Sequence, residues 1–382
     1  MLIIKDKSFL YSVAALVGSI VGVGIFAIPF TFAKAGFWFG VVFLFIVAGL
    51  ITIINLMYGE VILRTQSQHQ IVGYANIYLG LFFKRLAFFC TVFISYAALL
   101  AYIVVVGEFL SNVLFFFKIT PEQYSYIFFI ILSGLVLLGI KRVSWIELTL
   151  TSLFIFVVGL IAISALPQLE LSNLSAHSSH YWFLPYGVLV FAFAGFAGVP
   201  LQKEILVGKE QLLKKSIILS MIIVSCLYFI FSFAVVGVSG EATSPDAIRG
   251  LYEFLGEKII FLGSLFGVFA ISTAYLMLGC ALREVFELDY GIKKLFSWLL
   301  VIFPPIVLFW GRVRTFVDII GLAGSVALGL EMAILVAIYL KAKTKGNRMP
   351  EYDLSIPRII LYIFLAIFLS GVVYALVHSP IY

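Results

Sequence analysis

Long apolar segments dominate the sequence and recur from one end of the chain to the other. A helix that crosses the roughly 30 Å hydrocarbon layer of a membrane needs about 20 mostly apolar residues. We therefore predict eleven membrane-spanning helices, at residues 9–33, 38–63, 86–115, 124–140, 146–166, 182–202, 214–240, 258–282, 295–310, 316–340 and 358–377. The connections are short, so we expect a single all-α, polytopic membrane domain over residues 1–382.

Composition excludes an ordinary soluble protein. Hydrophobic residues make up 63% of the chain and charged residues only 12%, against about a quarter charged in soluble domains. The net charge of +6 does not indicate nucleic acid, because the basic residues lie at the ends of apolar segments and form no single patch. The three cysteines fall inside apolar segments without metal-ligand spacing, so no cofactor is expected apart from a possible sodium ion.

The positions of lysine and arginine predict the orientation of the chain. Loops on the cytoplasmic side of a membrane are enriched in these residues. With a cytoplasmic N-terminus, the basic residues on the outside are Lys34, Lys118, Arg249, Lys258, Arg312 and Arg314, out of 25. We predict an integral protein of the cytoplasmic membrane of a prokaryote, with its N-terminus inside and its C-terminus outside.

Two of the apolar segments carry glycines at mid-membrane followed by a proline. The first of these motifs runs from Gly24 to Pro29 and the second from Gly195 to Pro200, an offset of 171 residues. They lie in the first and the sixth segments, which are an odd number of segments apart. The second copy must therefore cross the membrane in the opposite direction. This pattern predicts an inverted repeat of five helices at 9–166 and five at 182–340, with an extra helix at 358–377.

Interrupted helices have a specific chemical use in a membrane. Interior glycine costs about 1 kcal/mol of helix propensity, and a backbone group without a hydrogen bond in hydrocarbon costs several kcal/mol more. Such backbone persists beside a polar cavity, where free amides hold a carboxylate and free carbonyls hold a cation. The alternative is that the glycines allow close helix packing, since Gly18 and Gly22 also have small-xxx-small spacing.

The segment from Gly18 to Pro29 resembles the first helix of the amino acid-polyamine-organocation transporter superfamily. The sixth segment, from Phe191 through Pro200 to Glu204, is similar to the auxin and amino acid permease branch or to the aromatic amino acid permeases. The resemblance implies the leucine-transporter fold, with discontinuous first and sixth helices. It also implies import of an amino acid by alternating access, driven by a sodium or proton gradient. Phenylalanines of the sixth segment would favour a neutral or aromatic substrate.

The same resemblance implies the residues of the site. The substrate would be held by Ser19, Ile20, Gly22, Val23, Gly24, Phe191, Phe193, Ala194 and Gly195. On the third segment, the hydroxyls of Tyr96 and Tyr102 are expected to face the pocket, and we add Tyr96 to the substrate residues. A sodium ion would be held by carbonyls of Gly18 and Val21 and by the hydroxyls of Ser272 and Thr273. These two hydroxyls alternatively bond to their own helix backbone.

Ionisable residues inside a membrane are expensive and are candidates for function. Glu108 and Glu331 lie deep in their segments and are predicted to carry a coupling proton, whereas Lys34 and Asp318 resemble an outer gate pair. The glutamates near segment ends are interpreted as structural or gating residues: Glu60, Glu147, Glu204 and Glu284.

Other classes of membrane protein remain as alternatives. A membrane enzyme needs a cluster of catalytic side chains at membrane depth, and the sequence shows none. A channel needs pore helices or rings of like charge, and a transporter of the same fold for another small solute is a further possibility. The expected partners are an amino acid, sodium or a proton, and the lipid bilayer, with no prediction of oligomeric state.

Overall fold

The computed structural model describes residues 6–175, 181, 184–244, 247–311 and 326–378. Helices make up most of this part of the chain, and it contains no β-strand. The helices are α1 (Lys7–Ile20), α2 (Gly24–Ala35), α3 (Phe37–Leu63), α4 (Ile71–Leu79), α5 (Leu81–Val113), α6 (Pro121–Leu138), α7 (Ile140–Ala165), α8 (Leu184–Ala192), α9 (Gly198–Ile205), α10 (Leu213–Ser239), α11 (Ile248–Leu255), α12 (Glu257–Glu284), α13 (Lys294–Trp310), α15 (Leu328–Lys345) and α16 (Arg358–His378).

Within the described residues, every predicted segment overlaps a helix or a pair of helices, while residues 182–183 and 316–325 of the sixth and tenth segments lie outside them. The first segment is the pair α1 and α2, and the sixth is the pair α8 and α9. Two short helices, α4 and α11, lie in stretches predicted as loops. Both have fewer than ten residues, too few to cross a membrane, so a search for long apolar runs cannot find them.

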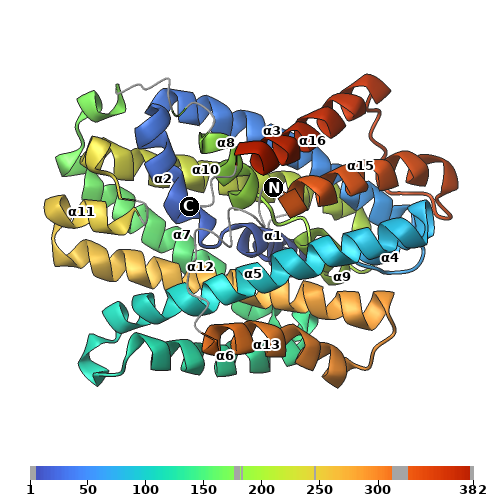
Figure 1. The fold of residues 1–382 in the computed structure, drawn as a ribbon, viewed down its shortest axis with the longest axis horizontal. Helices are drawn as coiled ribbons and strands as arrows, with labels where there is room; N and C mark the ends of the chain where they lie inside the picture. Colours follow the sequence, from blue (N-terminus) through green and yellow to red (C-terminus); the bar gives the residue numbers. More distant parts are fainter. Residues whose placement is uncertain (1–5, 176–180, 182–183, 245–246, 312–325, 379–382) are drawn as a thin grey trace.

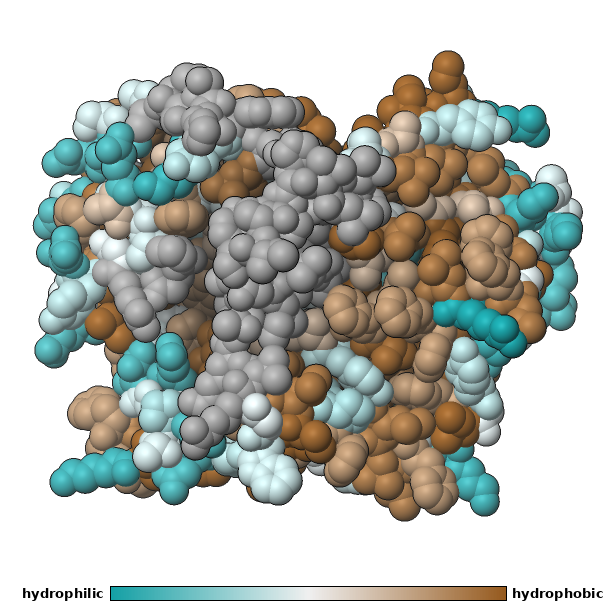
Figure 2. All heavy atoms as spheres, viewed as in Figure 1, coloured by the Kyte–Doolittle hydropathy of each residue, from teal (hydrophilic) through white to brown (hydrophobic). Residues whose placement is uncertain are grey.

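Helix length and composition support a membrane location. Six helices in the described residues are long and apolar enough to span a membrane, or seven if the bent pair α1 and α2 counts as one span. The count of eleven spans stays a prediction. Hydrophilic side chains gather at the left and right ends of the view, where α5 and α12 end, and the described residues between the grey atoms and the right end are mostly hydrophobic (Figure 2).

The helices form one bundle around α1 (Figure 1). Helix α1 packs against α7, α9, α10 and α12, while α12 also packs against α5. The largest apolar core runs between the first helices and α10, and a second core lies between α5, α6 and α12. The polar backbone of the two interrupted helices lies where these cores meet.

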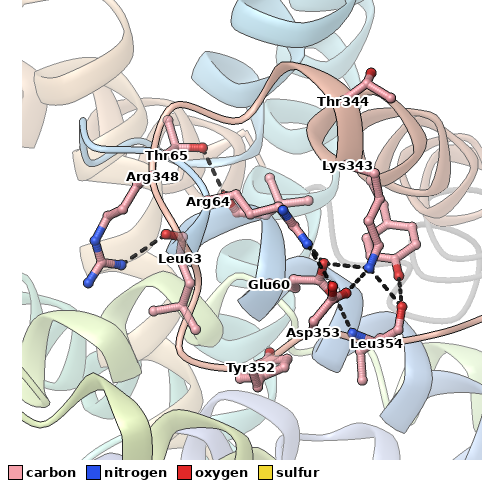
Figure 3. Close-up of polar contacts among 12 residues, drawn as sticks. Glu60, Leu63, Arg64, Thr65, Lys343, Thr344, Arg348, Tyr352, Asp353 and Leu354 are labelled. Atoms are coloured by element: carbon pink, nitrogen blue, oxygen red, sulfur yellow. Dashed lines mark hydrogen bonds and ion pairs between the residues drawn. The ribbon is translucent and has the colours of Figure 1, made fainter.

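Residues 346–356, here called the strap, connect α15 to α16 and lie across the end of α3 (Figure 3). The amides of Asn347 and Arg348 donate to the carbonyl of Arg64, at 3.0 and 3.1 Å. The hydroxyl of Tyr352 donates to the carbonyl of Leu56 at 2.7 Å. The strap therefore supplies partners for the carbonyl of Arg64, which follows the last turn of α3 and has none inside the helix.

A buried carboxylate fixes the strap to both helices (Figure 3). Glu60 on α3 is fully buried, and its Oε1 lies 2.7 Å from Arg64 Nε and 2.8 Å from Lys343 Nζ on α15. The amide of Leu354 donates to Glu60 Oε2 at 2.8 Å, and Asp353 pairs with Lys343. Because a lone buried carboxylate is costly, these partners hold α3, α15 and the strap together.

Candidate functional site

The first break separates α1 from α2 and bends the chain by 57°. The amide of Val21 still donates to the carbonyl of Val17 at 2.8 Å. In the described residues no backbone carbonyl accepts from the amides of Gly22, Val23 and Gly24. Two glycines within three residues weaken the helix here. The free amides lie at the start of α2, which is the positive end of its helix dipole.

The second break lies between α8 and α9. The amide of Ala194 donates to the carbonyl of Phe191 at 3.0 Å, and that of Gly198 to the carbonyl of Gly195 at 2.9 Å, so tight turns replace the helix. Pro200 falls in the first turn of α9, where a missing N–H costs nothing. The predicted interruption of both helices is therefore present in the structure.

The two breaks contact each other backbone to backbone. A Cβ built on Gly195 would lie 2.9 Å from both the Cα and the N of Ile20. A Cβ built on Gly24 would lie 2.9 Å from the Cα of Ala192. No side chain fits at either glycine without moving a backbone. Both explanations of these glycines therefore apply. The glycines interrupt the helices, and they also allow the two backbones to pack closely.

Two hydroxyls connect the breaks. Ser19 Oγ donates to the carbonyl of Gly195 at 3.1 Å. Tyr228, from α10, donates to the carbonyl of Ala192 at 2.7 Å and also lies 3.3 Å from that of Ile20. Tyr228 is fully buried. It was not selected from the sequence, because the carbonyls that it contacts lie far away along the chain and come close only in the folded protein.

A cavity of about 70 Å³ opens between the breaks, α5, α12 and α15. A water molecule needs roughly 10–15 Å³ on this measure, so there is room for several waters or for the polar head of an amino acid. The predicted substrate residues that line it are Ser19, Ile20, Gly22, Val23, Gly24, Phe191, Ala194 and Gly195.

Two of the predicted substrate residues lie elsewhere. Phe193 is fully buried and its ring packs against that of Tyr228, with centroids 5.0 Å apart. Tyr96 points from α5 toward α13, where its hydroxyl donates to the carbonyl of Leu300 at 2.7 Å. Neither residue lines this cavity.

Helix α5 contributes lining residues of which only Tyr102 was predicted to face the pocket. Thr91, Ser95, Ala98 and Tyr102 all line the cavity. They follow one another at intervals of four, three and four residues, so they share one face of the helix. This spacing of small and hydroxyl-bearing side chains was the available signal, whereas Tyr96 belongs to another face.

Glu331, from the start of α15, is the acidic side chain among the residues that line the cavity. It is buried, and its Oε1 accepts a hydrogen bond of 2.5 Å from Thr91 Oγ1. A smaller cavity of about 20 Å³ continues from Glu331 to Gln70, whose amide donates to Glu284 at 2.8 Å. Polar groups therefore run from the main cavity toward the end of α12.

Of the predicted sodium residues, Gly18 on α1 and Thr273 on α12 lie against each other. Val21 is buried; a methyl group on Gly18 would lie 3.0 Å from Thr273 Cβ, which places α1 directly against α12. The hydroxyls of Ser272 and Thr273 donate to the carbonyls of Val268 and Ala270 on their own helix, at 2.6 and 2.8 Å.

The remaining predicted residues are dispersed. Glu108 lies on the exposed side of α5 and does not line the cavity. Lys34 is in the last turn of α2, with its ammonium group 5.7 Å from the ring centroid of Phe30. Asp318, its predicted gate partner, lies outside the described residues.

Comparison with known proteins agrees with this architecture. The sequence matches the tryptophan/tyrosine permease family over residues 5–378. It is 23% identical over 363 residues to tyrosine-specific transport system 1 of Haemophilus influenzae, covering 89% of each chain. It is 22% identical over 356 residues to glutamine transporter 2 of Aliivibrio fischeri, covering 90% of this chain and 92% of the relative.

A solved structure shows the same fold. The crystal structure of MhsT in complex with L-phenylalanine superposes with a TM-score of 0.71 at 16% identity, covering 98% of each chain. The predicted all-α leucine-transporter fold is confirmed, while the residue limits of the two repeats stay a prediction. A membrane enzyme is excluded, because the matched family and both relatives are permeases or transporters. With a match that covers residues 5–378, this chain belongs to the tryptophan/tyrosine permease family.

Proposed function

We propose that the protein imports a neutral amino acid, preferentially an aromatic one, by alternating access, and that a sodium or proton gradient drives the import. The observation that carries this proposal is the meeting of two interrupted helices at one cavity inside the apolar bundle. Free peptide groups in such a place need a polar ligand to offset the cost of their exposure. An amino acid zwitterion supplies both charges in one small molecule.

The substrate carboxylate would bind at the start of α2. The amides of Gly22, Val23 and Gly24 have no backbone partner in the described residues and line the cavity. They lie at the positive end of the α2 dipole, which favours an anion. The substrate ammonium would lie toward the ends of α1 and α8, whose last carbonyls are at the negative ends of their helices.

The substrate side chain would lie against the aromatic part of the wall. Phe191, Phe196 and Tyr102 line the cavity together with Ile94 and Leu278. Aromatic rings contribute a large apolar surface and favour ring–ring contacts. The names of the relatives, for tyrosine and for glutamine, support a neutral substrate, and the wall favours an aromatic one.

Two sets of residues are available for the coupling cation. Carbonyls of Gly18 and Val21 with Ser272 and Thr273 are the predicted sodium ligands, and the contact of Gly18 with Thr273 supports this set. Glu331 is the predicted proton carrier that faces the cavity. Glu108 lies on the exposed side of α5, so we do not propose it as a proton carrier.

The proposed orientation places the strap and the end of α3 in the cytoplasm. Arg64, Lys343 and Arg348 lie at this end of the molecule, and basic residues are enriched on the cytoplasmic side of membrane proteins. The N-terminus would then be cytoplasmic and the C-terminus outside, in the cytoplasmic membrane of a prokaryote.

The test is uptake by purified protein in liposomes. Labelled tyrosine, phenylalanine, tryptophan, glutamine and leucine are offered separately, under an inward sodium gradient, an inward proton gradient or neither. We expect the uptake of aromatic amino acids to be saturable. Under one of the gradients, the concentration of the amino acid inside the liposomes should exceed equilibrium with the concentration outside. Uptake that never exceeds equilibrium would indicate a passive channel, and no uptake of any amino acid would contradict the substrate class.

A further inference from the structure

Glu331 on α15 is a buried carboxyl group in the wall of the main cavity. Its exposed fraction is 3%, and it lines the space between the two breaks. In the described part of the chain, the hydrogen bond from Thr91 to Oε1 is the one hydrogen bond of this carboxyl group, so Oε2 has no donor there. A buried carboxyl oxygen without a donor is costly. The described residues therefore leave one hydrogen-bonding position of Glu331 unused.

Glu331 lies where the main cavity meets the smaller one. The residues that line both cavities are Thr91, Ser95, Phe196, Ala197, Leu278 and Glu331. The residues whose amides are proposed to hold the substrate carboxylate, Gly22 to Gly24, line the main cavity and not the smaller one. Glu331 is therefore at the end of the main cavity that is remote from these amides.

The lining face of α5 leads from the amides to this end. Tyr102 lies beside the first break, because a methyl group built on Gly22 would be 2.9 Å from the Tyr102 hydroxyl. Thr91, about three turns earlier on the same face, donates to Glu331. A substrate with its carboxylate at the start of α2 can thus extend its side chain along α5 toward Glu331.

The wall beside Glu331 is apolar apart from two hydroxyl groups. Phe196 and Leu278 line it together with Thr91 and Ser95. A phenol or an indole brings one donor, whereas an ammonium group brings three and a guanidinium group five. Surplus donors would face the apolar wall without acceptors, which is costly. The lining therefore favours a neutral side chain with a donor over a cationic one.

Other polar groups of the smaller cavity do not supply the missing donor. Gln70 lines this cavity, but its side-chain amide donates to Glu284 at 2.8 Å. The hydroxyl of Tyr58, which lines it too, forms no hydrogen bond with any described residue. Within the described part of the chain, Thr91 is thus the one donor to Glu331, and a second donor has to come from the substrate.

We propose that Glu331 determines substrate specificity by accepting a hydrogen bond from the far end of the substrate side chain. The inference rests on the proposed function and names its substrate class: amino acids with a large, neutral side chain that ends in a donor, as a phenol or an indole does. Phenylalanine and leucine carry no such donor and leave the oxygen of Glu331 unpaired. The role is the same whichever ion drives transport.

The first experiment varies the ligand on the wild-type protein. Purified protein in liposomes exchanges labelled tyrosine by counterflow without an ion gradient, and unlabelled amino acids compete. Tyrosine and 4-aminophenylalanine carry a donor at the end of the ring, whereas 4-fluorophenylalanine, of similar shape, carries none. We expect the two donors to compete at least about tenfold more strongly than 4-fluorophenylalanine, the range for a hydrogen bond to a charged group. A smaller ratio overturns the proposal, as does stronger competition by lysine than by tyrosine.

The second experiment asks whether Glu331 causes this preference. Glu331→Leu removes the acceptor and keeps a side chain of similar size. We expect the ratio between tyrosine and 4-fluorophenylalanine to fall from at least about tenfold to less than about threefold, because the hydrogen bond that separates them is gone. Glu170→Leu, at an exposed carboxylate that does not line the cavity, should keep the wild-type ratio.

Each outcome decides the proposal. A folded, monodisperse Glu331→Leu that keeps the wild-type ratio overturns it, as does one in which all competitors weaken by the same factor, which would show a structural role. If Glu331→Leu aggregates, Glu331→Asp decides, because the shorter acid withdraws the acceptor: a lowered ratio supports the proposal and an unchanged ratio overturns it. Counterflow in wild type without preference for a donor is a failure of this inference alone. Absence of counterflow for every amino acid overturns the proposed function as well.

Discussion

Glycine at position 195 is required by contact with another backbone. The Cβ of Gly195→Ala would lie 2.3 Å from Ile20 Cγ1 and 2.9 Å from its Cα and N. We expect this variant to lose about 1–3 kcal/mol of stability, as overpacked sites do, and to transport poorly because the two breaks are pushed apart. Thermal unfolding in detergent and uptake into liposomes measure both effects.

Gly49→Ala is the matched control, because nothing lies within 4 Å of the added methyl group in α3. This variant should be as stable as wild type or gain up to about 1 kcal/mol of helix propensity. Equal stability of Gly195→Ala and Gly49→Ala would contradict the contact between the breaks.

The pair of Thr91 and Glu331 gives a second prediction at this scale. Thr91→Val keeps the shape of the side chain but removes the donor to Glu331, leaving a buried carboxyl group without this partner. Such a loss costs about 1–3 kcal/mol. We expect the KM for tyrosine uptake to rise severalfold in Thr91→Val and to return toward wild type in Thr91→Ser, which restores the hydroxyl. Equal KM values for the two variants would rule out a role for the hydrogen bond.

Single residues also show the limits of reading a site from sequence. Glycine and proline mark a helix interruption by their own backbone properties, so the lining residues Gly22, Gly24 and Gly195 were predicted. The sequence also shows where Glu147 lies along its helix. It does not show that Gly18 on α1 faces Glu147, because this contact depends on the rotation of α7 and on how α7 packs against α1.

At the scale of elements, α10 holds the two interrupted helices in register. Tyr228→Phe removes the hydroxyl that donates to the carbonyl of Ala192. We expect a loss of about 1 kcal/mol, the usual net value of one hydrogen bond, together with a higher KM for substrate. Tyr362→Phe on the exposed face of α16 serves as control. A normal KM in Tyr228→Phe would show that the breaks keep their geometry without this bond.

The strap between α15 and α16 predicts a dependence of stability on pH. The ion pair with Lys343 holds the pKa of Asp353 below its ordinary value of 3.8, and Arg64 adds to the effect. An acid with a lowered pKa in the folded state stabilises the fold above about pH 4, its unfolded value, and loses this contribution as the pH falls through the folded value.

The measurement is the unfolding temperature in detergent between pH 3 and pH 7, for wild type and Asp353→Asn. The difference between the two proteins should be present at pH 6 and should shrink below about pH 4. A difference that stays constant over this range would show that the charge of Asp353 contributes nothing. Asp6→Asn tests a second exposed pair in the same way, since a hydrogen bond from Lys209 lowers the pKa of Asp6.

The long helices were the most predictable part of this structure. In the described part of the chain, each predicted segment overlaps a helix or a pair of helices, because hydrophobicity over about 20 residues is a local property of the chain. The short helices α4 and α11 were missed because their stability comes from packing against larger neighbours, α5 for α4 and α12 for α11. The lining face of α5 was missed for a related reason, since its rotation is set by its neighbours.

At the scale of the whole molecule, the proposed orientation makes a direct prediction. In a background where the exposed Cys226 is replaced by Ser, Gln168→Cys should react with a membrane-impermeant maleimide in intact cells. Lys345→Cys, at the strap end, should react only after the cells are opened. Both positions are exposed at opposite ends of the bundle. The reverse pattern would invert the topology.

The hydrogen bonds of α1 fall on one side of it. Gln202 on α9 donates to the carbonyl of Ser12 at 2.9 Å, and Ser220 on α10 donates to that of Val13 at 3.2 Å. Toward α7 the same helix presents Gly18, which lies against the carboxyl group of Glu147, and that group has no hydrogen-bond partner in the described part of the chain. Contacts without directional bonds can slide past one another, whereas directional bonds resist shear. The contact of α1 with α7 at Gly18 therefore resists shear less than the contacts of α1 with α9 and α10.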